Sequence, residues 1–147
     1  MLSREEIAMK YMILINASQR DYAAMAGQAA GEQPGWTPED FGALGAFMES
    51  FNRDLAESGE LVDTRGLTAP VHARRIRWGE GMPVVTDGPY AEAEEVLAGY
   101  WIVECDSFDR ATQIAARLTG TPGPEHLRAR AYADVRPLAD SRDELDI

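Results

Sequence analysis

The chain has 147 residues, 45% of them hydrophobic and 27% charged, which suits one ordinary globular domain. Its formal net charge of −11 argues against a surface for direct binding of nucleic acid or of an anionic membrane, because phosphate contacts need clustered Lys and Arg. No apolar run in the sequence reaches the roughly 20 residues that span a bilayer. Cys105 is the only cysteine, which excludes an internal disulfide and favours a reducing, cytoplasmic location.

The N-terminal part of the chain is predicted to hold a leader, one strand and a loop. Residues 1–9 are interpreted as a leader, and Met9 is a candidate natural start because the first strand follows directly. Residues 10–15 are a continuous apolar run of strand length, which is typical of a strand covered on both faces. Residues 16–36 are polar and rich in Ala and Gly, with a weak helix over 22–30. A loop of this length predicts a mobile lid over a cavity.

Two helices are predicted from their capping signals. The first covers residues 38–58, with Thr37 as its N-cap and Gly59 as its C-terminal stop. The second runs from the N-cap Ser107 to about residue 119. Each helix carries one apolar stripe at helical spacing, so each is expected to cover a sheet.

The remaining strands are predicted from apolar runs and alternation. A short extended segment at 61–67 precedes a strand over 72–78, and after a glycine-rich turn residues 82–86 return as a hairpin arm. Residues 99–105 form a second near-continuous apolar strand. The last strand, 129–136, alternates apolar and polar side chains.

Without the short extra segments, the element order is strand, helix, strand, strand, helix, strand, which is the split βαβ arrangement. It predicts an α+β, ferredoxin-like fold in which an antiparallel sheet carries two helices on one face. In this topology the first and third main strands, 10–15 and 99–105, lie in the centre, and these two are apolar on both faces. We therefore expect a single domain over residues 10–138, followed by an acidic, frayed tail over 139–147.

The second face of the predicted sheet has no cover within the chain. Right-handed crossovers place both helices on the same face, yet the central strands remain apolar on the other one. An exposed apolar patch of that size is a liability in a monomer, so the pattern predicts a homodimer whose sheets pack face to face. The sequence does not decide whether Ile13 or Leu14 points to this open face.

The most distinctive string of the sequence is Thr-Asp-Gly-Pro-Tyr-Ala-Glu-Ala-Glu-Glu over residues 86–95. Asp87 can accept backbone N–H bonds in a turn, Gly88 permits a positive φ, and Pro89 fixes the next φ. The string therefore predicts a rigid turn that holds Asp87 and Tyr90 in fixed directions.

This string resembles the DGPF motif of YCII-related proteins, with Tyr90 where Phe is usual. Further matching segments are residues 10–12, 59–61, 66–67 and 135–137. The resemblance implies a dimeric α+β barrel with a cavity between the sheet faces. It also implies a link to extracytoplasmic-function sigma factors, because some members accompany or are fused to them. Related lyases and isomerases use a His near the start of the first helix, but residues 36–41 contain none.

The candidate site is centred on the turn. The candidate catalytic residues are Asp87 and His72, and the candidate ligand-binding residues are Asp87, Gly88, Pro89, Tyr90 and Glu92. A turn-stabilising role is the preferred interpretation of Asp87, because Asp-Gly-Pro is itself a turn sequence. Glu92, Glu94 and Glu95 are, with Asp87, candidate oxygen ligands of a metal ion. A solvated acidic stretch is the preferred interpretation of these glutamates, so no metal and no cofactor are predicted.

The other chemically active side chains have ordinary structural interpretations. His126 stands alone as a surface or capping residue, and Cys105 is expected to be a buried small hydrophobe. Four arginines, Arg75, Arg77, Arg130 and Arg136, are candidates for an anionic ligand, although solvation or pairing with Asp and Glu is the more common role.

Two functions from different classes fit the sequence. The first is a small-molecule-binding or regulatory module, and the second is a cofactor-free lyase or isomerase that acts on a small polar or aromatic compound. The sequence contains no phosphate-binding loop, dinucleotide fingerprint, zinc-type cluster or nucleophile elbow. The missing helix-start His and the absence of an organised acid–base pair favour the binding module.

Overall fold

The structure is a computed structural model that describes residues 8–27 and 35–146. Its strands are β1 (Met9–Ala17), β2 (Leu61–Gly66), β3 (Arg74–Gly79), β4 (Met82–Asp87), β5 (Val96–Cys105) and β6 (Asp134–Pro137). Its helices are α2 (Gln19–Met25), α3 (Pro38–Ser58), α4 (Phe108–Leu118) and α5 (Glu125–Arg128), with short 3₁₀ turns η1 (Pro70–His72) and η2 (Asp143–Leu145).

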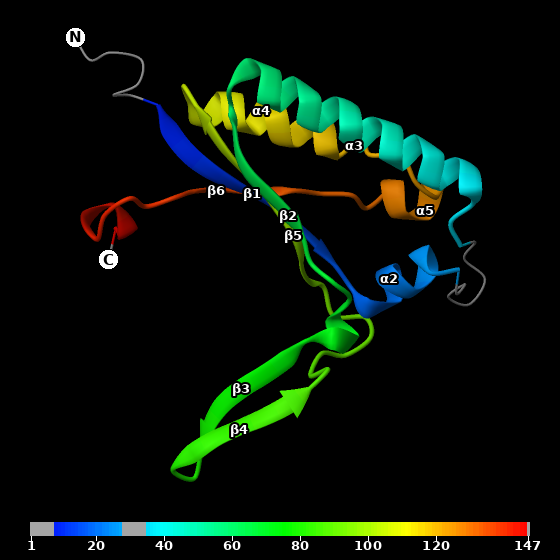
Figure 1. The fold of residues 1–147 in the computed structure, drawn as a ribbon, viewed down its shortest axis with the longest axis vertical. Helices are drawn as coiled ribbons and strands as arrows, with labels where there is room; N and C mark the ends of the chain where they lie inside the picture. Colours follow the sequence, from blue (N-terminus) through cyan, green and yellow to red (C-terminus); the bar gives the residue numbers. More distant parts are fainter. Residues whose placement is uncertain (1–7, 28–34, 147) are drawn as a thin grey trace.

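Four strands form an antiparallel sheet in the order β2-β5-β1-β6. The two central strands pair along their length, with Ile13 opposite Trp101 and Leu14 opposite Tyr100, and the register shifts between Ile15 and Asn16. α3 and α4 run side by side over one face of this sheet (Figure 1). This arrangement confirms the predicted α+β, ferredoxin-like fold.

The core lies between the sheet and the two long helices. Its largest fully buried side chains come from both layers: Ile13, Phe51, Leu55, Val103 and Ile114. Phe51 contacts the Trp101 ring edge-on, with 5.5 Å between ring centroids. Burial of this aromatic and aliphatic cluster is the main source of stability of the fold.

The two long helices form where their signals predict them. Thr37 and Asp40 form a capping box at the start of α3, which begins at Pro38, and Gly59 ends the helix with a φ of +79°. The Ser107 side chain accepts the backbone N–H of Arg110 at the start of α4. No helix in the described ranges is long and apolar enough to cross a membrane.

The second edge strand of the main sheet differs from the prediction. The segment at 61–67 was predicted to be a short extended segment outside the main fold. Residues 61–66 instead form the strand β2, which pairs with β5. The predicted strand 72–78 instead pairs only with β4, in a separate two-stranded sheet. The reason is proximity: α3 ends at the left-handed Gly59, and Glu104 donates its N–H to the carbonyl of Glu60, so the chain joins β5 immediately.

Two shorter elements also differ from the sequence pattern. Residues 129–133, predicted as strand, lie outside the ladder, because residues 125–128 close a local helical turn and β6 starts only at Asp134. α2 begins earlier than the predicted weak helix, because Ser18 and Asp21 form a capping box. Residues 28–34 of the predicted lid lie outside the described residues.

The open face of the sheet carries the alternate side chains of the central strands. Ile13 is fully buried in the core, whereas its neighbour Leu14 is only half-buried and points to the opposite face. Met12 and Ile102, which face each other across β1 and β5, are also half-buried on this side. The open face is therefore an apolar strip, and Leu14 rather than Ile13 belongs to it.

Candidate functional site

A cavity of about 560 Å³ lies between the end of the sheet and α3. Apolar side chains make most of its wall, namely those of Ile15, Leu44, Met48, Trp101, Leu118 and Leu127. They come from β1, α3, β5, α4 and α5, so the cavity depends on the whole tertiary fold. Concave, mainly apolar sites of this volume with a few polar groups are typical of small-molecule binding.

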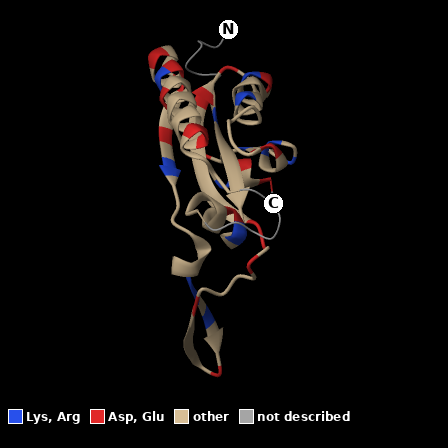
Figure 2. Ribbon diagram, turned by 90° about the vertical axis from the view of Figure 1, so that its right-hand side faces the viewer, with Lys and Arg blue, Asp and Glu red and all other residues tan. Residues whose placement is uncertain are grey.

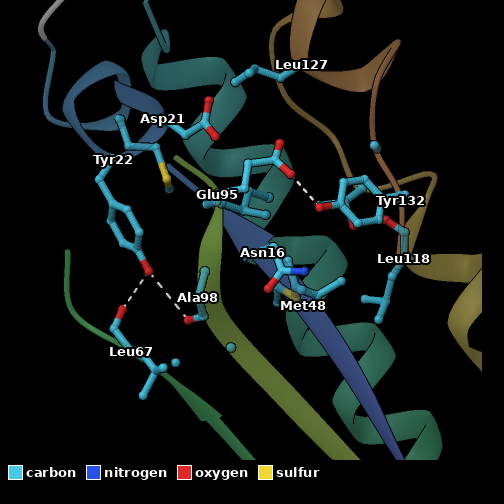
Figure 3. Close-up of a pocket in the computed structure, with 18 of the residues that line it drawn as sticks. Asn16, Asp21, Tyr22, Met48, Leu67, Glu95, Ala98, Leu118, Leu127 and Tyr132 are labelled. Carbon is cyan, nitrogen blue, oxygen red and sulfur yellow. Dashed lines mark hydrogen bonds between the residues drawn. The ribbon is translucent and has the colours of Figure 1, made fainter. Parts of the chain in front are cut away.

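Two side-chain pairs among the cavity-lining residues, Arg130–Asp21 and Tyr132–Glu95, join distant parts of the chain. We call these four residues the rim of the cavity. Arg130 donates to Asp21 of α2 at 2.8 Å, and the Asp21 side chain is only 18% exposed. The hydroxyl of Tyr132 donates to a carboxylate oxygen of Glu95, which precedes β5 (Figure 3). The segment between α5 and β6 is thereby attached to the opposite wall.

A third anchor ties α2 to the sheet. The hydroxyl of Tyr22 donates to the backbone carbonyl of Leu67 at 2.7 Å and to that of Ala98 at 3.4 Å (Figure 3). Burial raises the pKa of Tyr22, so its hydroxyl stays protonated and remains a donor at neutral pH. α2 therefore forms one wall of the cavity, on the segment where the sequence predicted a lid.

The two carboxylates of the rim, Asp21 and Glu95, have different partners. The hydrogen bond to Glu95 raises the pKa of Tyr132, so this hydroxyl is neutral at physiological pH. Asp21 is paired with Arg130, whereas no cationic side chain of the described residues forms an ion pair with Glu95. The rim therefore presents one carboxylate that is held by a neutral donor and is available to a ligand.

The predicted turn lies at the foot of the β3–β4 hairpin. Gly88 has a φ of +53° and donates its N–H to the carbonyl of Ala73 at 2.8 Å. The Asp87 side chain is 76% exposed and forms an ion pair with Arg74 at 3.0 Å. His72, in η1, is also exposed.

The other residues of the motif have structural contacts. The Arg75 guanidinium lies over the Tyr90 ring, 5.0 Å from its centroid, and Pro89 is half-buried beside it. The carbonyl of Glu92 accepts the backbone N–H of Arg20 at the start of α2. Of the residues predicted for the site, the described cavity wall includes neither His72 nor any of Asp87, Gly88, Pro89, Tyr90 and Glu92. Their catalytic and ligand-binding roles stay predictions.

The remaining candidates lie apart from one another. No group of three His, Cys, Asp or Glu side chains within residues 8–27 and 35–146 is arranged to hold a metal ion. Cys105 is buried as expected, and burial raises the pKa of its thiol. His126 lies in the short helix α5. Arg130 is the one predicted arginine that reaches the cavity, and there it is paired with a carboxylate.

The rim residues were only partly accessible to sequence reasoning. The Ser-x-x-Asp spacing of Ser18 and Asp21 is a capping-box signal that predicts the start of α2. Tyr132 and Arg130, by contrast, sit in an alternating pattern that predicts a solvent-facing strand edge. Nothing local shows that Arg130 meets a residue 109 positions earlier.

The cavity of the single chain is not the one that the resemblance implied. It lies on the helix-covered side of the sheet, whereas the implied cavity lies between the sheet faces of two chains. Formation of the latter requires a second copy, so it stays a prediction.

Comparison with known proteins agrees with the motif. A family model described as the YCII-related domain matches residues 9–121. An uncharacterised protein of Rhizobium meliloti (strain 1021) is 30% identical over 104 residues, which cover 71% of this chain and 80% of that protein. The matched residues of the family model end before Arg130 and Tyr132, so part of the cavity rim lies beyond it. This chain belongs to the family of proteins with a YCII-related domain.

Proposed function

We propose that this protein binds a small molecule in the cavity between α3 and the sheet. The observation that carries the proposal is a cavity of about 560 Å³ whose wall is mainly apolar and whose polar lining residues include Asp21, Glu95, Arg130 and Tyr132. Such a site favours a compound with an apolar body, aliphatic or aromatic, because burial of apolar area supplies most of the binding free energy.

The rim adds a preference for the polar end of that compound. Glu95 supplies a carboxylate without a cationic partner among the described side chains, and Tyr132 holds it from one side. A ligand group that donates hydrogen bonds, such as an amine, would complete the interactions of this carboxylate. We therefore propose an apolar compound with a donor or cationic end.

The test compares two substitutions on α3. Leu44→Trp places a large ring in the cavity, whereas Ala43→Trp places the same ring on the exposed side of the helix. Compounds are first selected from a panel of aromatic and aliphatic amines and their neutral analogues by a rise in thermal midpoint, and their affinity is then measured by calorimetry. We expect Leu44→Trp to lower affinity at least tenfold and Ala43→Trp to leave it unchanged. Binding that survives Leu44→Trp would place the ligand elsewhere.

The polar preference has its own matched pair. Glu95→Gln removes the rim carboxylate, and Glu94→Gln removes the charge of its exposed neighbour outside the cavity wall. We expect Glu95→Gln to lower the affinity for amines more than the affinity for their neutral analogues, and Glu94→Gln to have no such effect. Equal effects of the two variants would contradict a specific role of Glu95.

A cofactor-free lyase or isomerase is the second candidate, and the Glu95–Tyr132 pair favours it. A carboxylate next to a protonated hydroxyl can take a proton and return one. Incubation of each bound compound with the protein, followed by NMR, separates the candidates. Turnover that Tyr132→Phe abolishes would support the enzyme, and binding without turnover would support the binding module.

We also propose that the protein acts as a homodimer. The open sheet face exposes an apolar strip that includes Met12, Leu14 and Ile102, and burial between two copies would remove it from water. Sedimentation equilibrium at micromolar concentration should give about twice the 16.2 kDa mass of the chain. From the resemblance alone, we also propose a link to extracytoplasmic-function sigma factors.

A further inference from the structure

The β3–β4 hairpin is the least covered part of the described chain with a pronounced apolar face. It projects from the end of the main sheet, away from the helices (Figure 1). Register pairs Ile76 with Val85 and Trp78 with Pro83, and alternation puts all four side chains on one face of the hairpin. Ile76, Trp78 and Val85 are 64%, 73% and 58% exposed.

We do not expect the apolar face of the β3–β4 hairpin to remain exposed to water. A two-stranded hairpin by itself is marginally stable, and contiguous exposed apolar side chains mark interaction sites. Trp78 is especially costly to leave in water, because Trp carries a large apolar area and is enriched at the centres of interfaces. The apolar face of the hairpin therefore calls for a partner surface.

Charge indicates which partner. Residues 74–87 contain Arg74, Arg75 and Arg77 against Glu80 and Asp87, a net charge of +1, which leaves −12 for the rest of a chain of net charge −11. Figure 2 shows Lys and Arg on the hairpin and many acidic residues on the helical side of the molecule. A basic arm is complementary to the acidic body of a second copy, whereas two acidic bodies repel each other.

We propose that the apolar face formed by Ile76, Trp78, Pro83 and Val85 docks on a second copy of this chain. In a two-fold pair the apolar face of each hairpin would lie on the other protomer, with Arg75 and Arg77 on the opposite face of the hairpin. The proposal rests on the proposed homodimer and goes beyond the open sheet face, because it assigns part of the interface to the hairpin.

The experiment measures the dimer dissociation constant of the full chain by sedimentation equilibrium. Val85→Lys puts a charge on the apolar face, and Thr86→Lys puts the same charge on the opposite face of the same strand. We expect Val85→Lys to raise the dissociation constant at least tenfold and Thr86→Lys to leave it within twofold. Trp78→Ala, which adds no charge, should also raise it at least tenfold.

The outcomes separate this proposal from the homodimer itself. A monomeric wild-type chain would overturn both. A wild-type dimer that Val85→Lys and Trp78→Ala leave intact would overturn the hairpin contact alone. Equal weakening by Val85→Lys and Thr86→Lys would overturn the assignment to one face.

Folding and coverage are checked in parallel. All three positions are exposed, so circular dichroism and the thermal midpoint of each isolated variant show whether the domain is intact. Of the three tryptophans, Trp78 is exposed, Trp36 is half-buried and Trp101 is buried, so acrylamide quenching reports chiefly on the hairpin. Quenching should increase when Val85→Lys separates the copies, and unchanged quenching in a dissociated variant would contradict coverage of Trp78.

Discussion

β5 and β3 both contain side chains that favour strands, but one strand is buried on one face and the other is exposed. Every second residue of β5 from Gly99 to Cys105 is buried, because α3 and α4 cover that face of the sheet. Five of the six residues of β3 are exposed, and among the described strands it pairs with β4 alone. Strand formation therefore depends on local pairing, whereas burial depends on what the fold places above the strand.

The main domain and the β3–β4 hairpin each contain an arginine–carboxylate ion pair, but the two pairs differ in burial. In the body, Arg110 holds Glu60 with two 2.8 Å hydrogen bonds, and the Glu60 side chain is only 11% exposed. In the hairpin, the Arg74–Asp87 pair is more than 70% exposed on both sides. An ion pair in water adds little stability, whereas removal of one partner from a buried pair is costly.

The largest contrast should appear when an apolar side chain is truncated in each region. Phe51→Ala removes a fully buried ring that packs against Phe47 and Trp101, and we expect it to lower the free energy of unfolding by about 3–5 kcal/mol. Met82→Ala, on the face of the hairpin opposite Trp78, should change it by less than about 0.5 kcal/mol. Urea denaturation of both variants measures this difference, and similar losses would show that the hairpin is buried.

The ion pairs give the next contrast. Arg110→Ala removes the two hydrogen bonds that Arg110 donates to the buried Glu60 carboxylate, and we expect a loss of about 2–3 kcal/mol. Arg74→Ala should cost less than about 1 kcal/mol, since both members of the Arg74–Asp87 pair are solvated. The same denaturation measurement applies, and a smaller effect for Arg110→Ala than for Arg74→Ala would reverse this ranking.

The smallest expected effect is at the turn between the two regions. Gly88 has a φ of +53°, so Gly88→Val should cost about 1–2 kcal/mol through backbone strain. For a domain of this size, that corresponds to roughly 2–8 °C in thermal midpoint. Gly42→Ala in the exposed part of α3 is the control, because nothing lies within 4 Å of a Cβ there and it should raise the midpoint. An unchanged midpoint for Gly88→Val would mean that this turn bears no strain.

The family and the main elements could be predicted because their signals are local. Thr37 and Gly59 bound α3, Ser107 begins α4, and the apolar runs of β1 and β5 identify the central strands. The motif at 86–95 led to the family that the comparison then showed. Each of these inferences needs a few neighbouring residues and no knowledge of the rest of the chain.

The edge of the sheet and the site were decided by tertiary structure. The sequence predicted 72–78 as the edge strand of the main sheet, but the short path from Gly59 places 61–66 beside β5 and leaves 72–78 in a separate hairpin. The cavity rim joins Asp21 to Arg130 across 109 positions. By itself, the sequence determined the two long helices and the two central strands, because caps and periodicity act over a few residues. Pairing and cavity formation compare alternatives that lie far apart along the chain, and only the packed structure selects among them.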